Sequence, residues 1–209
     1  MKIHSDEKIK KLKELRQKGY SINEIVRELS IPKTTVWHHI QKVVVNPEYS
    51  AVLKAKIGSA GRIRKEKNLK IAEELAKKML NSPDREYLII FSMLYWAEGC
   101  KKSFDFVNSD GRMVDLCVKI LVKVFGIPKE RISPTMRIFS NMDKEECLKY
   151  WSKVVGLPKE RFFVRINDGG IKSSTKYGMC RITIKKSSST LKLVLSLIQQ
   201  FYDQLVKTL

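Results

Sequence analysis

The chain has 209 residues, of which 43% are hydrophobic, and this is enough apolar material for one or two folded domains. No run of about eighteen apolar residues occurs, and the charged first residues lack the apolar stretch of a secretory signal. These features exclude a membrane-spanning helix and predict a cytoplasmic protein. The net charge of +19 indicates a polyanionic partner, most often nucleic acid.

The positive charge is spread along the whole chain. Residues 1–82 carry 19 Lys and Arg against 9 Asp and Glu, a net +10, which leaves +9 for residues 83–209. A protein of membrane surfaces usually concentrates its charge on one amphipathic helix. We therefore expect residues 1–82 and residues 83–209 both to bind nucleic acid, and neither to bind a membrane. The four cysteines form no CxxC pair, so we expect buried thiols and no zinc site.

Three short helices are predicted before residue 45. Ser5 is expected to cap the first helix, which stops at Gly19. Ser21 and Glu24 have the spacing of a capping box at the start of the second helix. Pro32 is suited to begin the third, because the first helical position needs no N–H. Apolar residues recur at the spacing that packs such helices together.

The segment SINEIVRELSIPKTTVWHHI (residues 21–40) resembles the helix-turn-helix of resolvase-type recombinases and many bacterial regulators. Ser30 stands where that motif often has Gly in the turn. The resemblance implies that residues 1–45 bind double-stranded DNA, with the third helix in the major groove. The residues expected to touch DNA are Lys33, Thr34, Thr35, Trp37 and His38. The alternative is a helical hairpin that contacts proteins.

Residues 46–83 are interpreted as a basic linker and helix. Residues 43–60 contain Pro47 and Gly58 and are expected to be irregular, with a helix from 61 to about 80. Arg62, Arg64 and Lys65 are candidates to lie along phosphates or to enter a minor groove. The alternative is an ordinary solvated helix face.

Residues 84–209 are predicted to form a mixed domain of helices and strands, so that the whole chain is α+β. The helix at 84–98 is apolar nearly all round and is expected to be buried. Helices are then expected at about 111–125, 143–155 and 189–206, and strands at 103–107, 132–140, 162–167 and 179–186. Residues 119–132 are similar in sequence to residues 149–162. In each segment a helix stops at Gly, Pro follows and a strand begins.

Three of these strands alternate apolar and polar residues. Arg137, Arg165, Arg181 and Lys185 are expected on the polar face, opposite an apolar face that packs under helices. The basic loop from 167 to 176 adds Lys172 and Lys176, and a catalytic lysine is expected either there or at Lys185. A basic face of this kind is suited to follow phosphates. The alternative is the ordinary polar face of a solvated sheet.

The segment FSMLYWAEGCKK (residues 91–102) resembles the signature helix of LAGLIDADG homing endonucleases, whose variants often end in Ala-Glu-Gly or Gly-Glu-Gly. The resemblance implies an αβ domain whose antiparallel sheet forms a saddle on DNA. One signature copy implies a homodimer. In that family the acid near the end of the signature binds a divalent metal, a role that falls on Glu98, with Gly99 beside it. The implied cofactor is Mg²⁺ or Mn²⁺, and no small-molecule cofactor is expected.

Two functions follow from these patterns. The first is a homodimeric, metal-dependent DNA endonuclease in which Glu98 is the catalytic acid. The second is a transcription regulator that keeps the LAGLIDADG-like fold without cleavage. Met93 motivates the second, because it stands where the family's helices pack closely through Gly. A recombination or junction-processing factor is a third interpretation. All three predict association with the nucleoid of a prokaryotic-type cell.

Overall fold

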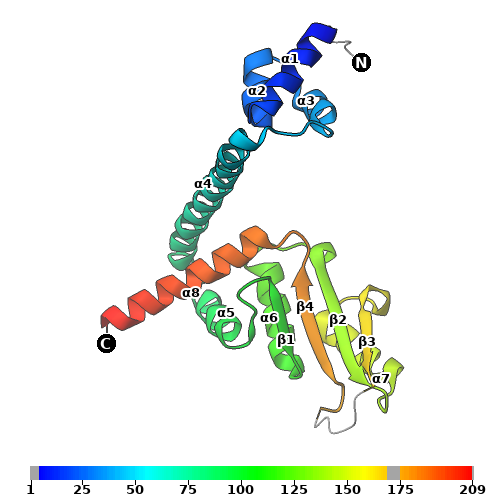
Figure 1. Ribbon diagram of the computed structural model, residues 1–209. Coiled ribbons are helices and arrows are strands. Elements are labelled where there is room, and N and C mark those ends of the chain that lie inside the picture. Colours follow the sequence, from blue (N-terminus) through cyan, green and yellow to red (C-terminus); the bar gives the residue numbers. More distant parts are fainter. Residues whose placement is uncertain (1–4, 169–174, 209) are drawn as a thin grey trace. The chain divides into compact units, whose positions relative to one another are not determined.

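The computed structural model of the protein describes residues 5–168 and 175–208. The chain divides into two compact units, residues 1–67 (unit 1) and residues 68–209 (unit 2), and each has its own core (Figure 1). Helix α4 (Pro47–Leu80) gives its first part to unit 1 and its last part to unit 2. No helix of the described residues is long and apolar enough to cross a membrane.

Unit 1 contains the three short helices predicted from the sequence. They are α1 (Asp6–Gln17), α2 (Ile22–Leu29) and α3 (Lys33–Ile40). The capping box is confirmed, since the Glu24 N–H donates to Ser21 Oγ (3.3 Å) and the Ser21 N–H donates to the Glu24 carboxylate (2.8 Å). Ser30 takes the left-handed conformation (φ 51°) that the turn between α2 and α3 needs. The core of these helices consists of Leu12, Ile25, Ile31, Val36 and Ile40.

The irregular linker expected at residues 43–60 is wrong, because α4 is one helix from Pro47 onwards. Pro47 occupies the first helical position, where a missing N–H costs nothing. Gly58 lies inside the helix, where glycine costs about 1 kcal/mol relative to alanine. That cost is offset by tertiary contacts: Leu53 is buried, and the Lys56 ammonium pairs with the Glu24 carboxylate at 2.9 Å. The sequence interpretation weighted the helix breakers and missed these contacts.

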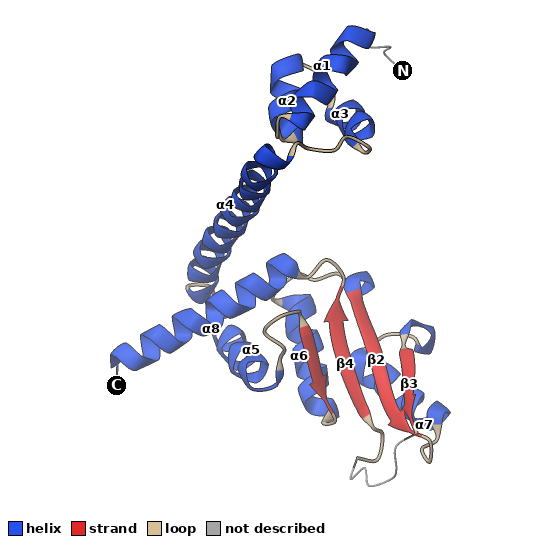
Figure 2. Ribbon diagram, in the orientation of Figure 1, coloured by secondary structure: helices blue, strands red, loops and turns tan. Residues whose placement is uncertain are grey.

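Unit 2 is built on a four-stranded sheet with the order β1-β4-β2-β3. The strands are β1 (Asp105–Asn108), β2 (Ile132–Phe139), β3 (Phe163–Asn167) and β4 (Met179–Ile184). Helices α6 (Gly111–Lys123) and α7 (Lys144–Val155) cover one face of the sheet (Figure 2). Helix α8 (Ser188–Thr208) follows the last strand. The mixed α+β class is confirmed, and the element ends differ from the expected ones by a few residues.

The sheet is not wholly antiparallel, which corrects the expectation. β4 pairs antiparallel with β1 and β2, but β2 and β3 run parallel. The sequence similarity between residues 119–132 and 149–162 accounts for the parallel pairing of β2 and β3. Helices α6 and α7 both lead through a left-handed glycine (Gly126, φ 63°; Gly156, φ 66°) and a proline into a strand. Because both copies leave their helix in the same way, the strands that follow point in the same direction, with α7 as the crossover.

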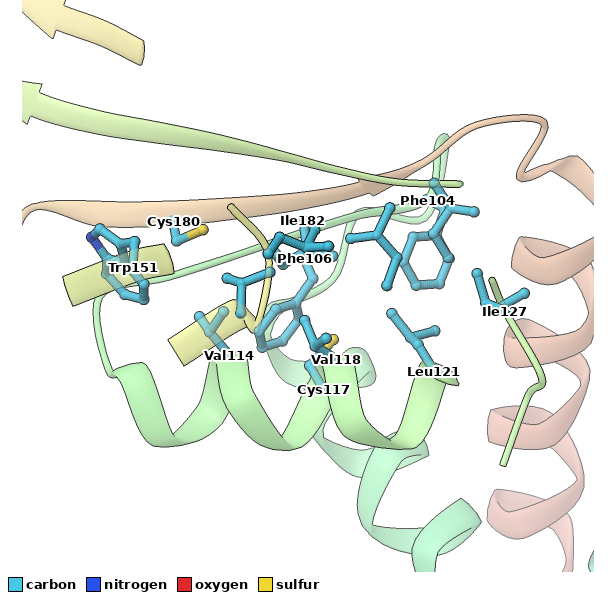
Figure 3. Packing of buried hydrophobic residues seen from close by; sticks show 14 of the residues in the cluster. Phe104, Phe106, Val114, Cys117, Val118, Leu121, Ile127, Trp151, Cys180 and Ile182 are labelled. Carbon is cyan, nitrogen blue, oxygen red and sulfur yellow. The ribbon is translucent and has the colours of Figure 1, made fainter. Parts of the chain in front are cut away.

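The main core lies between the sheet and its helices (Figure 3). Phe106 and Ile182 from the strands meet Val114 and Leu121 from α6, and all four are fully buried. Trp151 of α7 is also fully buried and donates from Nε1 to the Tyr177 carbonyl (2.7 Å). Cysteines 117, 147 and 180 are buried free thiols, as predicted, and Cys100 is half-buried.

Helix α5 (Arg85–Glu98) packs against α8 in a second cluster of buried residues. The expectation that α5 is buried nearly all round is wrong. Its buried residues are Leu88, Phe91, Ser92 and Tyr95, while Tyr87, Ile90 and Trp96 are exposed. Trp96 meets Tyr202 of α8 edge to face, with ring centroids 6.0 Å apart. The described residues therefore leave an apolar face of α5 and α8 in solvent.

Candidate nucleic-acid interface

Helix α3 presents one face to solvent. It buries Val36 and Ile40 in the core of unit 1. The predicted DNA-contact residues lie around the rest of the helix, where Lys33, Thr34, Trp37 and His38 are exposed and Thr35 is half-exposed. Trp37 is 56% exposed, so its indole is accessible to a partner. The solvent-exposed part of the helix therefore offers an ammonium group, hydroxyls, an imidazole and an indole.

The predicted basic residues of α4 do not all face one way. Arg62, Arg64 and Lys65 lie in a stretch of α4 that is exposed throughout. Successive residues of a helix are about 100° apart, so Arg62 and Arg64 point in directions about 200° apart. An extended arm would have allowed both to follow the same phosphates. The helix separates them. Of the two, only Arg64 lines a surface hollow that lies beside the start of α2.

The open face of the sheet in unit 2 carries the predicted arginines. β2 and β4 alternate buried and half-exposed residues, so Arg137 and Arg181 lie opposite the core. Arg165 of β3 pairs with Arg137 in the parallel register and is exposed. No helix of the described residues covers this face (Figure 2). The predicted polar face therefore exists, although not all of its charges are free.

Arg181 is tied to the fold. Its Nε lies 3.1 Å from the carboxylate of Asp105 on the neighbouring strand β1, and neither side chain is more than about a third exposed. Arg165 lies over the ring of Phe163, with 5.7 Å between Cζ and the ring centroid. Phe163 itself is 61% exposed. An ion pair and a cation–π contact thus orient two of the three sheet arginines.

Other expected contacts of unit 2 fall at its edges. Lys185 lies just beyond the end of β4 and is exposed, and its backbone N–H donates to the Arg131 carbonyl (2.9 Å). Lys176 is exposed and lies over the Tyr177 ring. Lys172 lies outside the described residues. Ile166, which alternates with Arg165 along the edge strand β3, is 51% exposed and so does not join the buried apolar face.

Glu98 is the last residue of α5 and its side chain is exposed. Gly99 is buried against Tyr95, and a Cβ at position 99 would lie 2.6 Å from that ring. The hydroxyl of Tyr95 donates to the Cys100 carbonyl (2.7 Å) and accepts from the Asp105 N–H (3.2 Å). Burial raises the pKa of Tyr95 to about 12, so this hydroxyl stays protonated. The turn after α5 is thereby fixed.

Lys101 occupies the carbonyl end of α5, a feature that the sequence interpretation missed. Its ammonium donates to the carbonyls of Trp96 (2.6 Å) and Gly99 (2.6 Å) and lies 3.5 Å from that of Tyr95. A cation at a helix C-terminus is favourable, because the last carbonyls lack partners within the helix. The signal in the sequence was a lysine just after the helix-ending Glu98-Gly99.

The implied divalent metal does not fit this arrangement while Lys101 is in place. A metal bound by Glu98 and the Gly99 carbonyl would approach the ammonium that already holds that carbonyl, and the two cations would repel each other. Within residues 5–168 and 175–208, no three His, Cys, Asp or Glu side chains gather into a metal-binding group. A metal at Glu98 therefore requires Lys101 to release the Gly99 carbonyl.

Comparison with known proteins gave no relative. No protein-family model, curated protein or solved structure matches the chain.

Proposed function

We propose that the protein is a sequence-specific double-stranded DNA-binding protein of regulatory type that reads the major groove with α3. The exposed face of α3 carries this proposal. Its Lys33, Thr34 and Thr35 start the helix, where a helix that enters the groove end-first meets base edges, and Trp37 and His38 extend the same face. The succession α2, tight turn, α3 supports a helix-turn-helix architecture for unit 1.

The sheet of unit 2 is the proposed second DNA surface. A helix-free face with arginines at positions 137, 165 and 181 suits contacts with the phosphate backbone, which add affinity without base specificity. The order of α5 followed by this sheet supports a LAGLIDADG-like architecture. The first hairpin of that fold is reduced here to the four residues of β1 and a single bridge between Gly99 and Phe106.

A homodimer is part of the proposal. Trp96 of α5 lies against Tyr202 of α8, and both are exposed, as is Leu205; a two-fold axis beside these side chains would let two copies bury them. Trp96, Tyr202 and Leu205 would then be shielded from water. We place the dimer with the nucleoid of a prokaryotic-type cell.

Metal-dependent DNA cleavage is the second candidate function. The observation that favours it is the exposed carboxylate of Glu98 at the end of α5, next to a turn fixed by Tyr95. The Lys101 ammonium on the Gly99 carbonyl favours the regulator instead. With Mg²⁺ or Mn²⁺ bound at Glu98, the metal would supply charge stabilisation for attack of water on a phosphodiester.

Selection from a random duplex library tests the DNA-binding proposal. We expect the full chain to enrich one motif, and Trp37→Ala to weaken binding to that motif about 10- to 100-fold, the cost of losing a good base contact. Val44→Ala, which removes another exposed apolar side chain of unit 1, is the matched control and should change affinity less than twofold, roughly the scatter of neutral surface changes. Absence of any duplex binding by the wild-type chain would overturn the proposal.

Nicking of supercoiled plasmid separates the two candidate functions. Wild type and Glu98→Gln are each incubated with Mg²⁺ and with Mn²⁺. The regulator predicts DNA binding by both proteins and no nicking by either. Metal-dependent nicking that disappears in Glu98→Gln would make the protein an endonuclease and assign Glu98 as its acid.

A further inference from the structure

A basic hollow lies in unit 1 beside the start of α2. Its volume is about 440 Å³, and it is bounded by the end of α1, the first turns of α2 and α3, and the first part of α4. Its polar lining consists of Arg16, Ser21, Asn23, Lys33, Lys56 and Arg64. All of these residues belong to unit 1. The hollow is therefore a feature of one compact body.

The hollow has an excess of positive charge. Four of its lining side chains are cations, and the neighbouring carboxylate is that of Glu24. Glu24 is already bound, since it accepts from the Ser21 N–H and pairs with Lys56 at 2.9 Å. The Nε of Arg16 is buried and has no hydrogen-bond partner within the described residues. Cations gathered in a concave surface attract anions more strongly than the same charges spread over a convex one.

The side of α4 that lines the hollow allows a partner to approach the helix backbone closely. Lys56 and Arg64 are eight residues apart, about 12 Å along the helix axis, and both line the hollow. Between them the lining consists of Ile57, Ala60 and Gly61. No atom lies within 4 Å of where a Cβ of Gly61 would be. Small residues flanked by cations leave room for the backbone of a partner.

The position of Lys33 relates the hollow to the α3 surface. Lys33 is the first residue of α3 and lines the hollow, while the residues that follow it form the exposed face of that helix. A duplex whose major groove holds the start of α3 has its phosphate backbone at the edge of that groove. The ligand chemistry that this geometry favours is therefore the phosphodiester backbone of duplex DNA.

We propose that the hollow binds backbone phosphates of the DNA that α3 reads, and that α4 is thereby part of the DNA interface of unit 1. The inference rests on the proposed DNA-binding function and extends it to Lys56 and Arg64. Contacts of this kind fix the orientation of the protein on the duplex and carry no base specificity.

Two double variants test the inference in the full chain. Lys56→Met with Arg64→Met removes two cations from the hollow. Lys54→Met with Lys70→Met removes the same charge from the same helix at exposed positions outside the hollow. Affinity for a random-sequence duplex is measured by fluorescence anisotropy over a range of salt concentrations, and circular dichroism checks the helix content.

We expect the hollow variant to bind every duplex more weakly, by about 10-fold or more at physiological salt, and to lower the slope of log affinity against log salt by about 1.8, which is 0.9 per lost phosphate contact. The control variant should keep its slope within about half of one phosphate contact of the wild type. Lys56→Arg with Arg64→Lys, which keeps both charges, should restore binding. Since Lys56→Met also leaves Glu24 unpaired, all variants are measured again with Glu24→Gln.

The outcomes distinguish this inference from the function on which it rests. If the wild type binds no duplex, the proposed function fails. If the wild type binds and the two doubles weaken it equally, only the overall charge matters and the hollow is not a site. If DNA binding survives in the hollow variant while inorganic phosphate still binds the wild type at Lys56 and Arg64, the hollow takes a free anion and the DNA assignment is overturned.

Discussion

The two units are both basic, but they use their cations differently. In unit 2 three arginines hold the fold together: Arg181 pairs with Asp105, and Arg131 and Arg161 donate to backbone carbonyls of neighbouring segments. In unit 1 Lys33 and Arg64 line a hollow and Trp37 is exposed on α3. Positive charge alone therefore does not identify a binding surface.

The largest effect is expected from Arg181→Met, because it removes a partner from a charge that is mostly buried. Asp105 would keep its carboxylate in the sheet without the guanidinium, which costs about 2 kcal/mol of stability for a partly buried pair. Urea denaturation of the full chain measures the loss. Adding Asp105→Asn should recover part of it, and the double-mutant cycle should give a favourable coupling energy. A coupling energy of zero would mean that the pair does not hold β1 to β4.

Lys101→Met should cost less, about 1 kcal/mol, because the ammonium is exposed although it serves the carbonyl end of α5. Amide hydrogen exchange in the last turn of α5 should become faster, since the cap is lost. Lys102→Met is the matched control and should leave that exchange unchanged. The same variant tests whether the Lys101 ammonium prevents a divalent metal from binding at Glu98. Mn²⁺ binding that appears with Lys101→Met and disappears when Glu98→Gln is added would identify Lys101 as the group that excludes the metal.

A pH dependence is expected in unit 1. The Ser21 N–H and the Lys56 ammonium lower the pKa of Glu24 to about 2 in the folded protein, while an unfolded glutamate titrates near pH 4.3. A carboxyl whose folded pKa is depressed stabilises the fold above its unfolded pKa, and this contribution is lost as the pH falls from about 4 to about 2. Thermal unfolding over this range should be less pH-dependent in Glu24→Gln. Equal profiles would show that the capping box does not depend on the charge of Glu24.

The smallest effect on stability is expected from Lys33→Met, which removes an exposed cation of α3. Stability should change by no more than about 0.5 kcal/mol, as for other surface substitutions. DNA affinity should fall several-fold, with the loss greater at low salt. Lys207→Met removes one exposed charge from α8 and should change neither quantity. If Lys33→Met destabilised unit 1 as strongly as Arg181→Met destabilises unit 2, the contrast between free and structural cations would fail.

Much of the fold could be predicted from local patterns. The capping box at Ser21 and Glu24, the glycine stops after α6 and α7, and the alternation in β2 and β4 depend on residues close together in the chain. The continuous α4 could not, because the burial of Leu53 and the ion pair of Lys56 with Glu24 of α2 depend on tertiary packing. The parallel pairing of β2 and β3 was implied by the repeated helix-to-strand exit, although the prediction did not use it.

By itself, the sequence determined the helices and strands other than the first part of α4, the α+β class, and the large positive charge, because these properties follow from residue type and spacing along the chain. Only the tertiary structure decided which charges stay available. It tied Arg181 to Asp105 and Lys101 to the carbonyls of α5, and it placed Arg64 in the hollow and Arg62 outside it. The physical reason is that the strength of a charge depends on its neighbours in space and on its distance from water, and these are set when distant segments pack together.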